Sequence, residues 1–326
     1  MNTDERITGC IIGLAAGDAL GAPLDGSKPG SVKTAFKTVS DYVDAEDILG
    51  DKLFRWRTPG LYGAPAQQAL ALLETTLEKR RFDCEAAAAA LVKLSRGDSQ
   101  FQYGVFRGAP PELRDAIEKI KPGYNQNTVG IAYPGCAPAA RVAPVAIHHR
   151  EHKKLFIDKI IESCIITHKS PLSISAAAAV SFTIAELLNG NISGAGDSQR
   201  AASAAAEFCR EAEDALAARF SFIFDGMPED DPSLHAFSAS MGRLADTIGE
   251  PQEKIDAILA ELADPFAKFE LKRPTLDFAL SAVPRAISVF LKNFSDPAKA
   301  LAAAVGQGGA AEAAGAITGA LCGAAH

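Results

Sequence analysis

Alanine-dense apolar runs, broken by Gly, Pro or Asn, dominate the pattern of hydrophobic and polar positions along the chain. Examples are residues 85–94, 175–188, 201–219 and 301–305. No stretch repeats the alternation of apolar and polar residues that is typical of a β-meander, and no strand–turn–helix unit recurs. Alanine is the strongest helix former. The pattern therefore predicts an all-α fold with about ten to fourteen helices of ordinary length.

Two of the expected helices carry glycine at every fourth position. The glycines are Gly9, Gly13, Gly17 and Gly21 near the start, and Gly315, Gly319 and Gly323 near the end. A glycine inside a helix costs about 1 kcal/mol relative to alanine, so such stripes need a purpose. A bare stripe lets another backbone come very close, as small-xxx-small contacts do. We expect the first and last helices to pack against one another or against a shared central helix.

The clearest loops are NGNISGAGDS at 189–198 and DGMPEDDPS at 225–233, both rich in turn-forming residues. They flank a helical pair without isolating a piece that has its own core. We therefore expect a single domain over residues 1–326, with a helical excursion at about 191–234.

Composition narrows the function classes. The chain has 326 residues with a net charge of −7 and a pI of about 5.5, which argues against a sequence-independent grip on nucleic acid. No uninterrupted run of about 18 apolar residues exists, and the N-terminus lacks the basic start of a secretory signal, so we expect neither a membrane span nor export. The six cysteines form no C-x-x-C pair and are typical of buried thiols in a reducing compartment. We expect a cytoplasmic protein.

Common catalytic motifs are missing from the sequence: there is no P-loop, G-x-G-x-x-G after a strand, H-E-x-x-H or G-x-S-x-G. His148, His149 and His152 could share a metal by spacing, but the basic residues around them favour a solvated helix start or turn. His168, between Thr167 and Pro171, is either a pocket residue or a core or capping histidine.

Two charged residues have apolar neighbours. Arg141 in AARVAPVAI either extends to the surface or pairs with a carboxylate or anion in a cleft. Asp18 lies inside the first glycine-striped helix. It is either a structural acid that accepts hydrogen bonds from the backbone of a following loop, or a ligand contact. The sequence leaves both alternatives open for each residue.

Four segments together resemble the ADP-ribosylglycohydrolase family, all-α hydrolases that remove ADP-ribose with two magnesium ions. GCIIGLAAGDALGAPLD is similar to the family's opening motif, with Asp25 in place of the usual Glu. GCAPAARVAPVAI keeps Arg141 and Pro144 of a second motif, and THKSPLSISAAAAVSFTIAELLNG resembles the helix that follows it. The segment from residue 283 to 323 resembles the terminal module, whose motif is G-G-D-x-D-T. The resemblance covers about residues 5 to 323 and implies the family's fold.

The departures from the family fall on its metal ligands. LYGAPAQQALALLE places Gly63, Ala64, Pro65 and Ala66 where the resemblance implies T-D-D-T. In the terminal motif Gly308 and Gly309 remain, but Ala310, Glu312 and Ala313 replace Asp, Asp and Thr. Two magnesium ions bring four positive charges, which the surviving carboxylate of Glu312 cannot offset. We expect no metal site and no cofactor.

The resemblance then implies where a vestigial site lies. The segment from Asp18 to Asp25, the start of the Pro65 helix and the segment from Gly308 to Glu312 are expected to converge on one cleft. Asp18, Asp25 and Glu312 are its candidate catalytic carboxylates. Candidate ligand-binding residues are Tyr62, Gln67, Arg141, His168, Gly308 and Gly309. Two helix N-termini are expected to direct unpaired amides into the cleft, which suits an anion, whereas the acids favour a neutral, hydroxyl-rich group such as ribose.

The leading hypothesis is a pseudoenzyme that keeps the fold and a cleft for a nucleotide or ribose. Its partners would be ADP-ribose, a nucleotide or an ADP-ribosylated protein. One alternative is a metal-independent glycosidic hydrolase that uses two of the three acids. Another is a purely structural or interaction protein. The sequence does not indicate the oligomeric state.

Overall fold

The computed structural model describes residues 2–44, 46, 59–97, 106–227, 231–266 and 277–326. This part of the chain contains fifteen α-helices and no strand, which confirms the all-α prediction and exceeds the expected helix number by one. The helices are α1 (Thr3–Gly21), α2 (Pro29–Phe36), α4 (Ala64–Lys79), α5 (Cys84–Arg96), α6 (Pro111–Ile120), α7 (Ala137–Arg141), α8 (Ala143–His149), α9 (Lys153–Ile165), α10 (Pro171–Leu188), α11 (Ser198–Arg219), α12 (Ala236–Thr247), α13 (Gln252–Ala263), α14 (Ala279–Lys292), α15 (Pro297–Val305) and α16 (Ala311–Ala325). Short 3-10 helices are η1 (Ala22–Leu24), η3 (Ala195–Asp197), η4 (Ser221–Phe224), η5 (Pro232–His235) and η6 (Asp264–Phe266).

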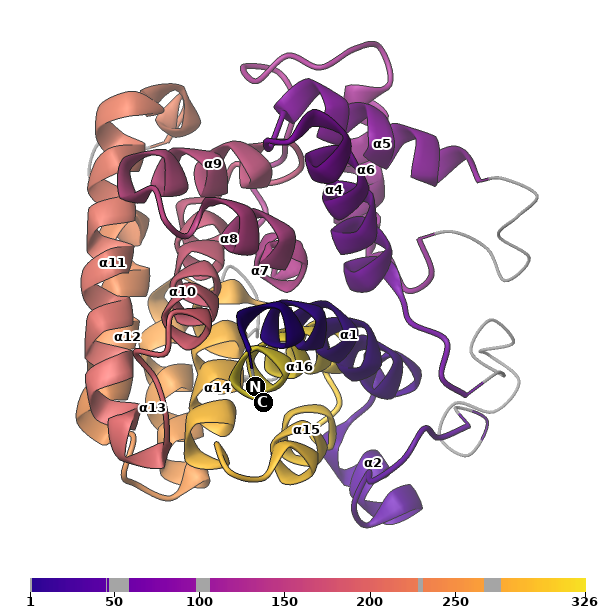
Figure 1. Ribbon diagram of the computed structural model, residues 1–326, viewed down its shortest axis with the longest axis vertical. Coiled ribbons are helices and arrows are strands. Elements are labelled where there is room, and N and C mark those ends of the chain that lie inside the picture. Colours follow the sequence, from indigo (N-terminus) through magenta and orange to yellow (C-terminus); the bar gives the residue numbers. More distant parts are fainter. Residues whose placement is uncertain (1, 45, 47–58, 98–105, 228–230, 267–276) are drawn as a thin grey trace.

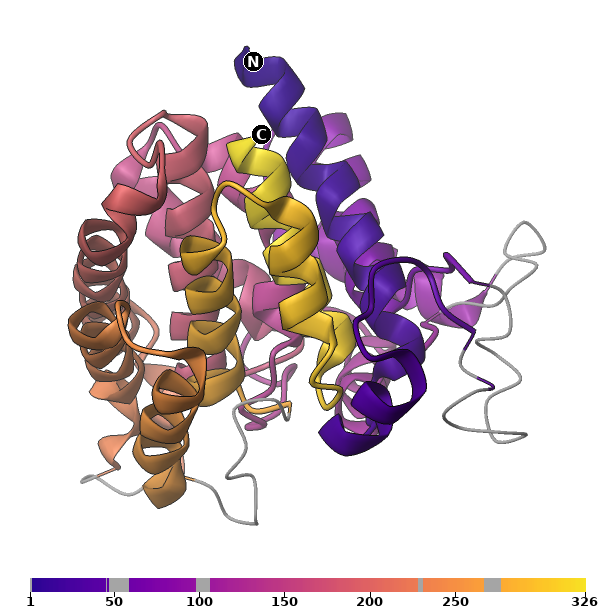
Figure 2. The same cartoon turned by 90° about the horizontal axis from the view of Figure 1, so that it is seen from below.

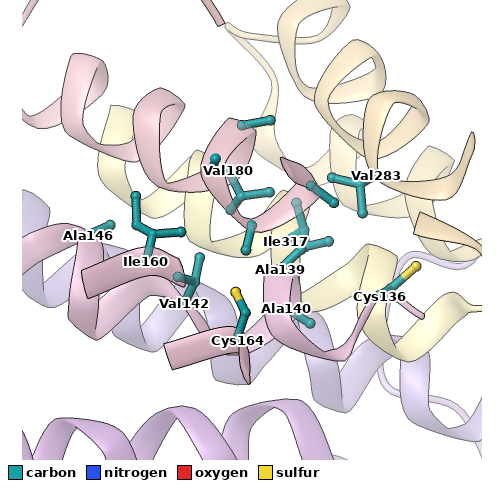
Figure 3. Close-up of a cluster of buried hydrophobic side chains, with 14 of the residues drawn as sticks. Cys136, Ala139, Ala140, Val142, Ala146, Ile160, Cys164, Val180, Val283 and Ile317 are labelled. Carbon is teal, nitrogen blue, oxygen red and sulfur yellow. The ribbon is translucent and has the colours of Figure 1, made fainter. Parts of the chain in front are cut away.

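Helix α10 forms the centre of the core, and nearly every one of its residues is buried. In Figure 1, α7 to α9 and α14 surround it, α11 to α13 lie along one side of the molecule, and α4 to α6 lie on the opposite side. Figure 3 shows side chains from five segments meeting in this core: Val142, Ile160, Val180, Val283 and Ile317. Because many of the positions between them are alanine, the helices approach closely. Helix α11, within the expected excursion, contributes side chains to the same hydrophobic core.

The two glycine-striped helices, α1 and α16, pack antiparallel against one another along their length, as expected (Figure 2). Glycines face glycines in register: Gly9 meets Gly323, Gly13 meets Gly319 and Gly17 meets Gly315. A Cβ atom at Gly13 would lie 2.2 Å from the Gly319 carbonyl oxygen, far inside van der Waals contact. The stripes are therefore required by backbone-to-backbone packing.

Two helical segments of the described chain, Thr3–Leu24 and Pro171–Leu188, are long and apolar enough to cross a membrane by length and composition. Within the structure 56% and 89% of their most apolar windows are buried against other parts of the protein. Their apolar composition is therefore also that of helices packed in a protein core. All six cysteines are free thiols; five are buried, and Cys84 is half-buried.

Candidate functional site

Asp18 lies in the last turn of α1 and is fully buried, with its carboxylate directed at the start of α4. The Gly63 amide donates to Oδ1 and the Ala66 amide donates to Oδ2, each at 2.7 Å. Gly63 is the residue that precedes α4, and Ala66 is in its first turn. Asp18 thus accepts hydrogen bonds from backbone amides, as the first of the two alternatives predicts.

Glu312, in the first turn of α16, completes the same arrangement. Its Oε1 accepts a hydrogen bond of 3.0 Å from the Ala64 amide, and its own amide donates to Oδ1 of Asp25 at 3.2 Å. The glycine stripes of α1 and α16 end close to this point, where a Cβ atom at Gly21 would touch the Ala311 carbonyl. The antiparallel pair thus presents its acids to α4, and the three segments converge as expected.

Every backbone donor at the start of α4 has a partner. A helix leaves its first four N–H groups without intrahelical partners. In α4 Asp18 accepts from Gly63 and Ala66, Glu312 accepts from Ala64, and Pro65 has no N–H. The expectation that helix N-termini direct unpaired amides into the cleft is therefore wrong for α4, because the acids already occupy those amides.

A small cavity of about 90 Å³ lies beside this junction. Its walls carry three carboxyl groups, one amide side chain and otherwise Ala, Gly, Pro and Leu. The lining residues are Asp25, Ala64, Pro65, Gln68, Gly108, Pro110, Leu113, Ala137, Asp277, Ala310, Glu312 and Ala313. Pockets that hold drug-sized ligands have about 300–1,000 Å³. The cavity lies well below that range, and the polar part of its lining consists of carboxyl and amide side chains.

Two charged residues of this region escaped the sequence analysis. Asp277, which precedes α14, lines the cavity and accepts a 2.7 Å hydrogen bond from the Cys136 amide. Arg107 is close enough for its charge to act on Asp18 and Glu312, and its side chain donates to the Tyr62 carbonyl. Of these two residues, only Asp277 could have been noticed in the sequence, because it comes immediately before an apolar helical run.

Burial dominates the electrostatics of the acids. It raises the pKa of Asp18 to about 7, against the opposing effects of the two amides and of Arg107, and the charge of Asp25 adds to the rise. Burial likewise raises the pKa of Asp277, while the Cys136 amide opposes the change. Desolvation disfavours a charged carboxylate, so both groups are more easily protonated than a surface aspartate.

Arg141 and His168 lie in the interior and do not line the cavity. Arg141 donates to Gln68 Oε1 at 2.6 Å, to Thr167 Oγ1 at 2.7 Å and to the Ser163 carbonyl at 2.9 Å. It therefore neither reaches the surface nor faces a carboxylate, because neutral acceptors take its guanidinium. Burial lowers the pKa of His168 to about 3, and its Nδ1 is 2.9 Å from Thr167 Oγ1. The link to the cavity is indirect, through the wall residue Gln68.

Tyr62 and Gln67 lie on another side of α4, along a groove between α4 and α5. The Gln67 side chain accepts from the Arg107 amide at 3.1 Å, and the guanidinium of Arg107 lies 5.2 Å from the centre of the Tyr62 ring. These two candidates thus position the Arg107 segment and are not among the cavity lining.

Gly308 and Gly309 have positive φ angles of 65° and 63°, which glycine adopts without strain. Their amides donate to the Val305 and Ser27 carbonyls. The backbone that approaches them closely is the chain's own: a Cβ atom at Gly308 would lie 2.3 Å from the Ser27 carbonyl oxygen. They shape the turn before α16, and their amides are not open to a ligand.

The expectation of a solvated histidine cluster is wrong for His149. Its ring is buried and its Nε2 accepts a 3.3 Å hydrogen bond from the Phe82 amide, while His148 and His152 are exposed. Burial lowers the pKa of His149 to about 4, so it is neutral at pH 7.

The residues at the junction do not fit a pair of magnesium ions. Positions 63–66 and 310 have no side-chain oxygen, and the carboxylates of Asp18, Asp25 and Glu312 accept hydrogen bonds from backbone amides. Within the described ranges, no three His, Cys, Asp or Glu side chains gather in a group that could hold a metal ion. Magnesium needs near-octahedral oxygen ligation, which this arrangement does not supply.

A family model described as ADP-ribosylglycohydrolase matches residues 1–326. An uncharacterized protein of Archaeoglobus fulgidus is 28% identical over 183 residues, which cover 56% of this chain and 55% of that protein. ADP-ribosylarginine hydrolase Tri1 of Serratia proteamaculans is 27% identical over 191 residues, covering 57% of this chain and 48% of the relative. The matched region thus spans about half the length of each of these curated relatives.

The fold also matches a solved structure described as an ADP-ribosylglycohydrolase-related protein complex. The TM-score is 0.63 at 20% sequence identity, and the match covers 100% of this chain and 88% of the other. At this identity the likeness establishes a shared fold.

Proposed function

This chain belongs to the ADP-ribosylglycohydrolase family, and we propose that it is a member without metal-dependent hydrolase activity. The supporting observation is that the three candidate carboxylates accept hydrogen bonds from backbone amides at helix ends. Asp18 and Glu312 accept hydrogen bonds from the first amides of α4, and Asp25 accepts from α16, so these carboxylates stabilise helix ends. A magnesium pair would have to compete with those amides for the same oxygens.

The proposed ligand class is a neutral, hydroxyl-rich group such as the ribose of ADP-ribose or of a nucleotide. Asp25, Asp277, Glu312 and the Gln68 amide line a cavity of about 90 Å³, which is too small for a whole dinucleotide-sized molecule. Carboxyl and amide oxygens accept hydrogen bonds from hydroxyls. A phosphate is disfavoured, because the lining carries acidic side chains and no Lys or Arg.

Isothermal titration with ADP-ribose, ribose and AMP, each with and without Mg²⁺, tests binding. We expect weak binding of ribose or ADP-ribose that is unchanged by Mg²⁺ and weakened in the Gln68→Leu variant, measured at a temperature where that variant, which also loses an acceptor of Arg141, is still folded. The matched control is Gln252→Leu, which alters a partly buried glutamine that bonds Asp256 and Ser288, away from the cavity. Binding that requires Mg²⁺ would contradict the proposal. An absence of binding to all three probes would favour a structural or interaction protein.

A metal-independent glycosidic hydrolase is the second candidate, and one observation favours it. Asp277, whose pKa is raised by burial, lines the same cavity as Asp25 and Glu312, and glycoside cleavage needs one protonated and one charged carboxyl group. An assay on an ADP-ribosylarginine peptide separates the candidates. The pseudoenzyme gives no release of ADP-ribose in EDTA or in Mg²⁺. Release in EDTA that is lost in Asp277→Asn would establish the hydrolase instead.

A further inference from the structure

Gly63 and Glu312 occupy one shared volume at the start of α4. A Cβ atom built on Gly63 would lie 1.4 Å from Oε1 of Glu312 and 2.6 Å from its carboxyl carbon. Both distances are shorter than any non-bonded contact, so a side chain at residue 63 and the observed position of Glu312 exclude one another. The backbone of Gly63 has a φ of −105°, which other residues also adopt. Space, and not conformation, is therefore what restricts residue 63.

The Glu312 carboxylate binds the start of α4 as a bound anion would. Oε1 accepts from the Ala64 amide at 3.0 Å, at the positive end of a sixteen-residue helix. The Glu312 side chain is 5% exposed, so it is held inside the site and not on its rim. The two neighbouring donors, Gly63 and Ala66, are already bound by Asp18.

We propose that Glu312 is an intramolecular ligand of the α4 N-terminus, and that the missing side chain of Gly63 is what admits it. The pair closes the site from within: the carboxylate takes the volume and the amide that a small external carboxylate would otherwise use. Residues 63 and 312 then form one interdependent unit. This inference rests on the proposed function in one respect, that no metal ion competes for the carboxylate.

A double-substitution cycle measures the interdependence. In the wild-type background, Gly63→Ala must expel the Glu312 carboxyl group from its buried position, which leaves the Ala64 amide without its acceptor. In the Glu312→Ala background the nearest remaining atom is the Arg107 carbonyl oxygen, 3.1 Å from the new Cβ, so the change requires a shift of only a few tenths of an ångström. We expect Gly63→Ala to raise the unfolding equilibrium constant about 10- to 100-fold more in the wild type than in Glu312→Ala, as for groups in direct contact.

Small carboxylates give a second readout that a steric effect alone would not move. Glu312→Ala removes as many non-hydrogen atoms as acetate contains, and formate is smaller still. We expect formate to raise the melting temperature of Glu312→Ala in a concentration-dependent way, and chloride at equal ionic strength to have no such effect. In the Gly63→Ala/Glu312→Ala double variant the new Cβ fills that volume, so the formate effect disappears.

Gly242→Ala is the matched control, because Gly242 lies within α12 and a Cβ there meets nothing within 4 Å. Its effect should be the same in the wild type and in Glu312→Ala. If Glu312→Ala does not fold, Glu312→Gln takes its place. Glutamine keeps the length and the acceptor, so Gly63→Ala should then be as costly as in the wild type.

Additive effects of Gly63→Ala and Glu312→Ala, or no response of Glu312→Ala to formate, would overturn the proposal. So would a costless Gly63→Ala in both the wild type and Glu312→Gln. None of these measurements involves hydrolysis, ADP-ribose or metal, so their failure is distinct from a failure of the proposed function.

Discussion

The Gly63 amide donates a 2.7 Å hydrogen bond to Oδ1 of Asp18, although the two residues belong to different segments of the chain. This bond fixes the start of α4 to the end of α1. Since α1 is itself packed against α16, whose Glu312 binds the next amide of α4, three helix ends are joined by side-chain oxygens. The start of α4 is therefore anchored to the ends of two other helices.

Removing the Asp18 carboxylate should destabilise the fold strongly. Asp18→Ala leaves the buried amides of Gly63 and Ala66 without acceptors, at about 1–3 kcal/mol each, so we expect a loss of about 2–6 kcal/mol in urea denaturation. The control is Asp296→Ala, which removes an exposed cap whose oxygen accepts from Lys299. That change should cost about 1 kcal/mol. Equal losses for the two variants would contradict a special role for Asp18.

Asp18 should also make stability depend on pH. Its pKa is raised from the ordinary 3.8 to about 7, so the folded state holds the proton more strongly than the unfolded state does. The contribution is complete below about pH 4 and is lost as the pH rises through 7, at up to about 1.4 kcal/mol per pH unit. The free energy of unfolding of the wild type minus that of Asp18→Asn should fall over this range.

Asp83 provides the comparison for that pH series, because the Ala86 amide lowers its pKa. Its contribution is present above the ordinary pKa and lost in more acidic solution. The wild type minus Asp83→Asn difference should therefore be flat between pH 5 and pH 7. A flat Asp18→Asn difference over the same range would show that the carboxylate is charged in the folded state.

Much of this architecture could be predicted from the sequence, and what made each feature predictable differs. The α1–α16 contact was predictable because the steric need of each glycine recurs every four residues. The meeting of Asp18, Pro65 and Glu312 followed from the resemblance alone. The partners of Arg107 and Asp277 were not predictable, since Tyr62 and Cys136 are distant in sequence and no local spacing encodes them.

The environments of His149 and Arg141 could not be predicted, because they depend on which side chains are buried in the folded protein. His149 lies in a basic, polar stretch, and its neighbours His148 and His152 are indeed exposed. Its own ring faces inward, where Nε2 accepts a hydrogen bond from the Phe82 amide of the α4–α5 connection. The acceptors of Arg141 are likewise neutral and lie on two other segments, whereas the sequence-based alternatives were the surface, or a carboxylate or anion in a cleft.

Adding one methyl group should have opposite effects on stability at two helical glycines, one in the α1–α16 contact and one outside it. Gly13→Ala places a Cβ atom 2.2 Å from a backbone oxygen of α16, so the helices must separate, and we expect a loss of at least about 1–3 kcal/mol. Gly242→Ala, inside α12 with open space around it, should gain up to about 1 kcal/mol. Thermal denaturation of both variants measures the contrast. A melting temperature that Gly13→Ala leaves unchanged would contradict the close approach.

Arg141→Lys should not behave as a conservative change. A single ammonium group cannot reproduce the forked contacts with Gln68, Ser163 and Thr167, so we expect a loss of about 2–4 kcal/mol. Arg243→Lys, at an exposed ion pair with Asp246 of 3.7 Å, should change stability by less than about 1 kcal/mol. Denaturant titrations of the pair provide the measurement. If Arg141→Lys left stability unchanged, a hydrogen bond to one of the three acceptors would be sufficient.

The pairing of α1 with α16 also determines when the protein can complete its fold during synthesis. The residues in contact are about 300 positions apart, so the first helix leaves the ribosome long before its partner exists. Until then its glycine face is exposed, and a glycine-rich helix is a poor helix on its own. Contacts of such large sequence separation form slowly, since loop closure precedes them. The nascent chain thus emerges with an apolar segment unprotected, and that interval is when chaperones would act on it.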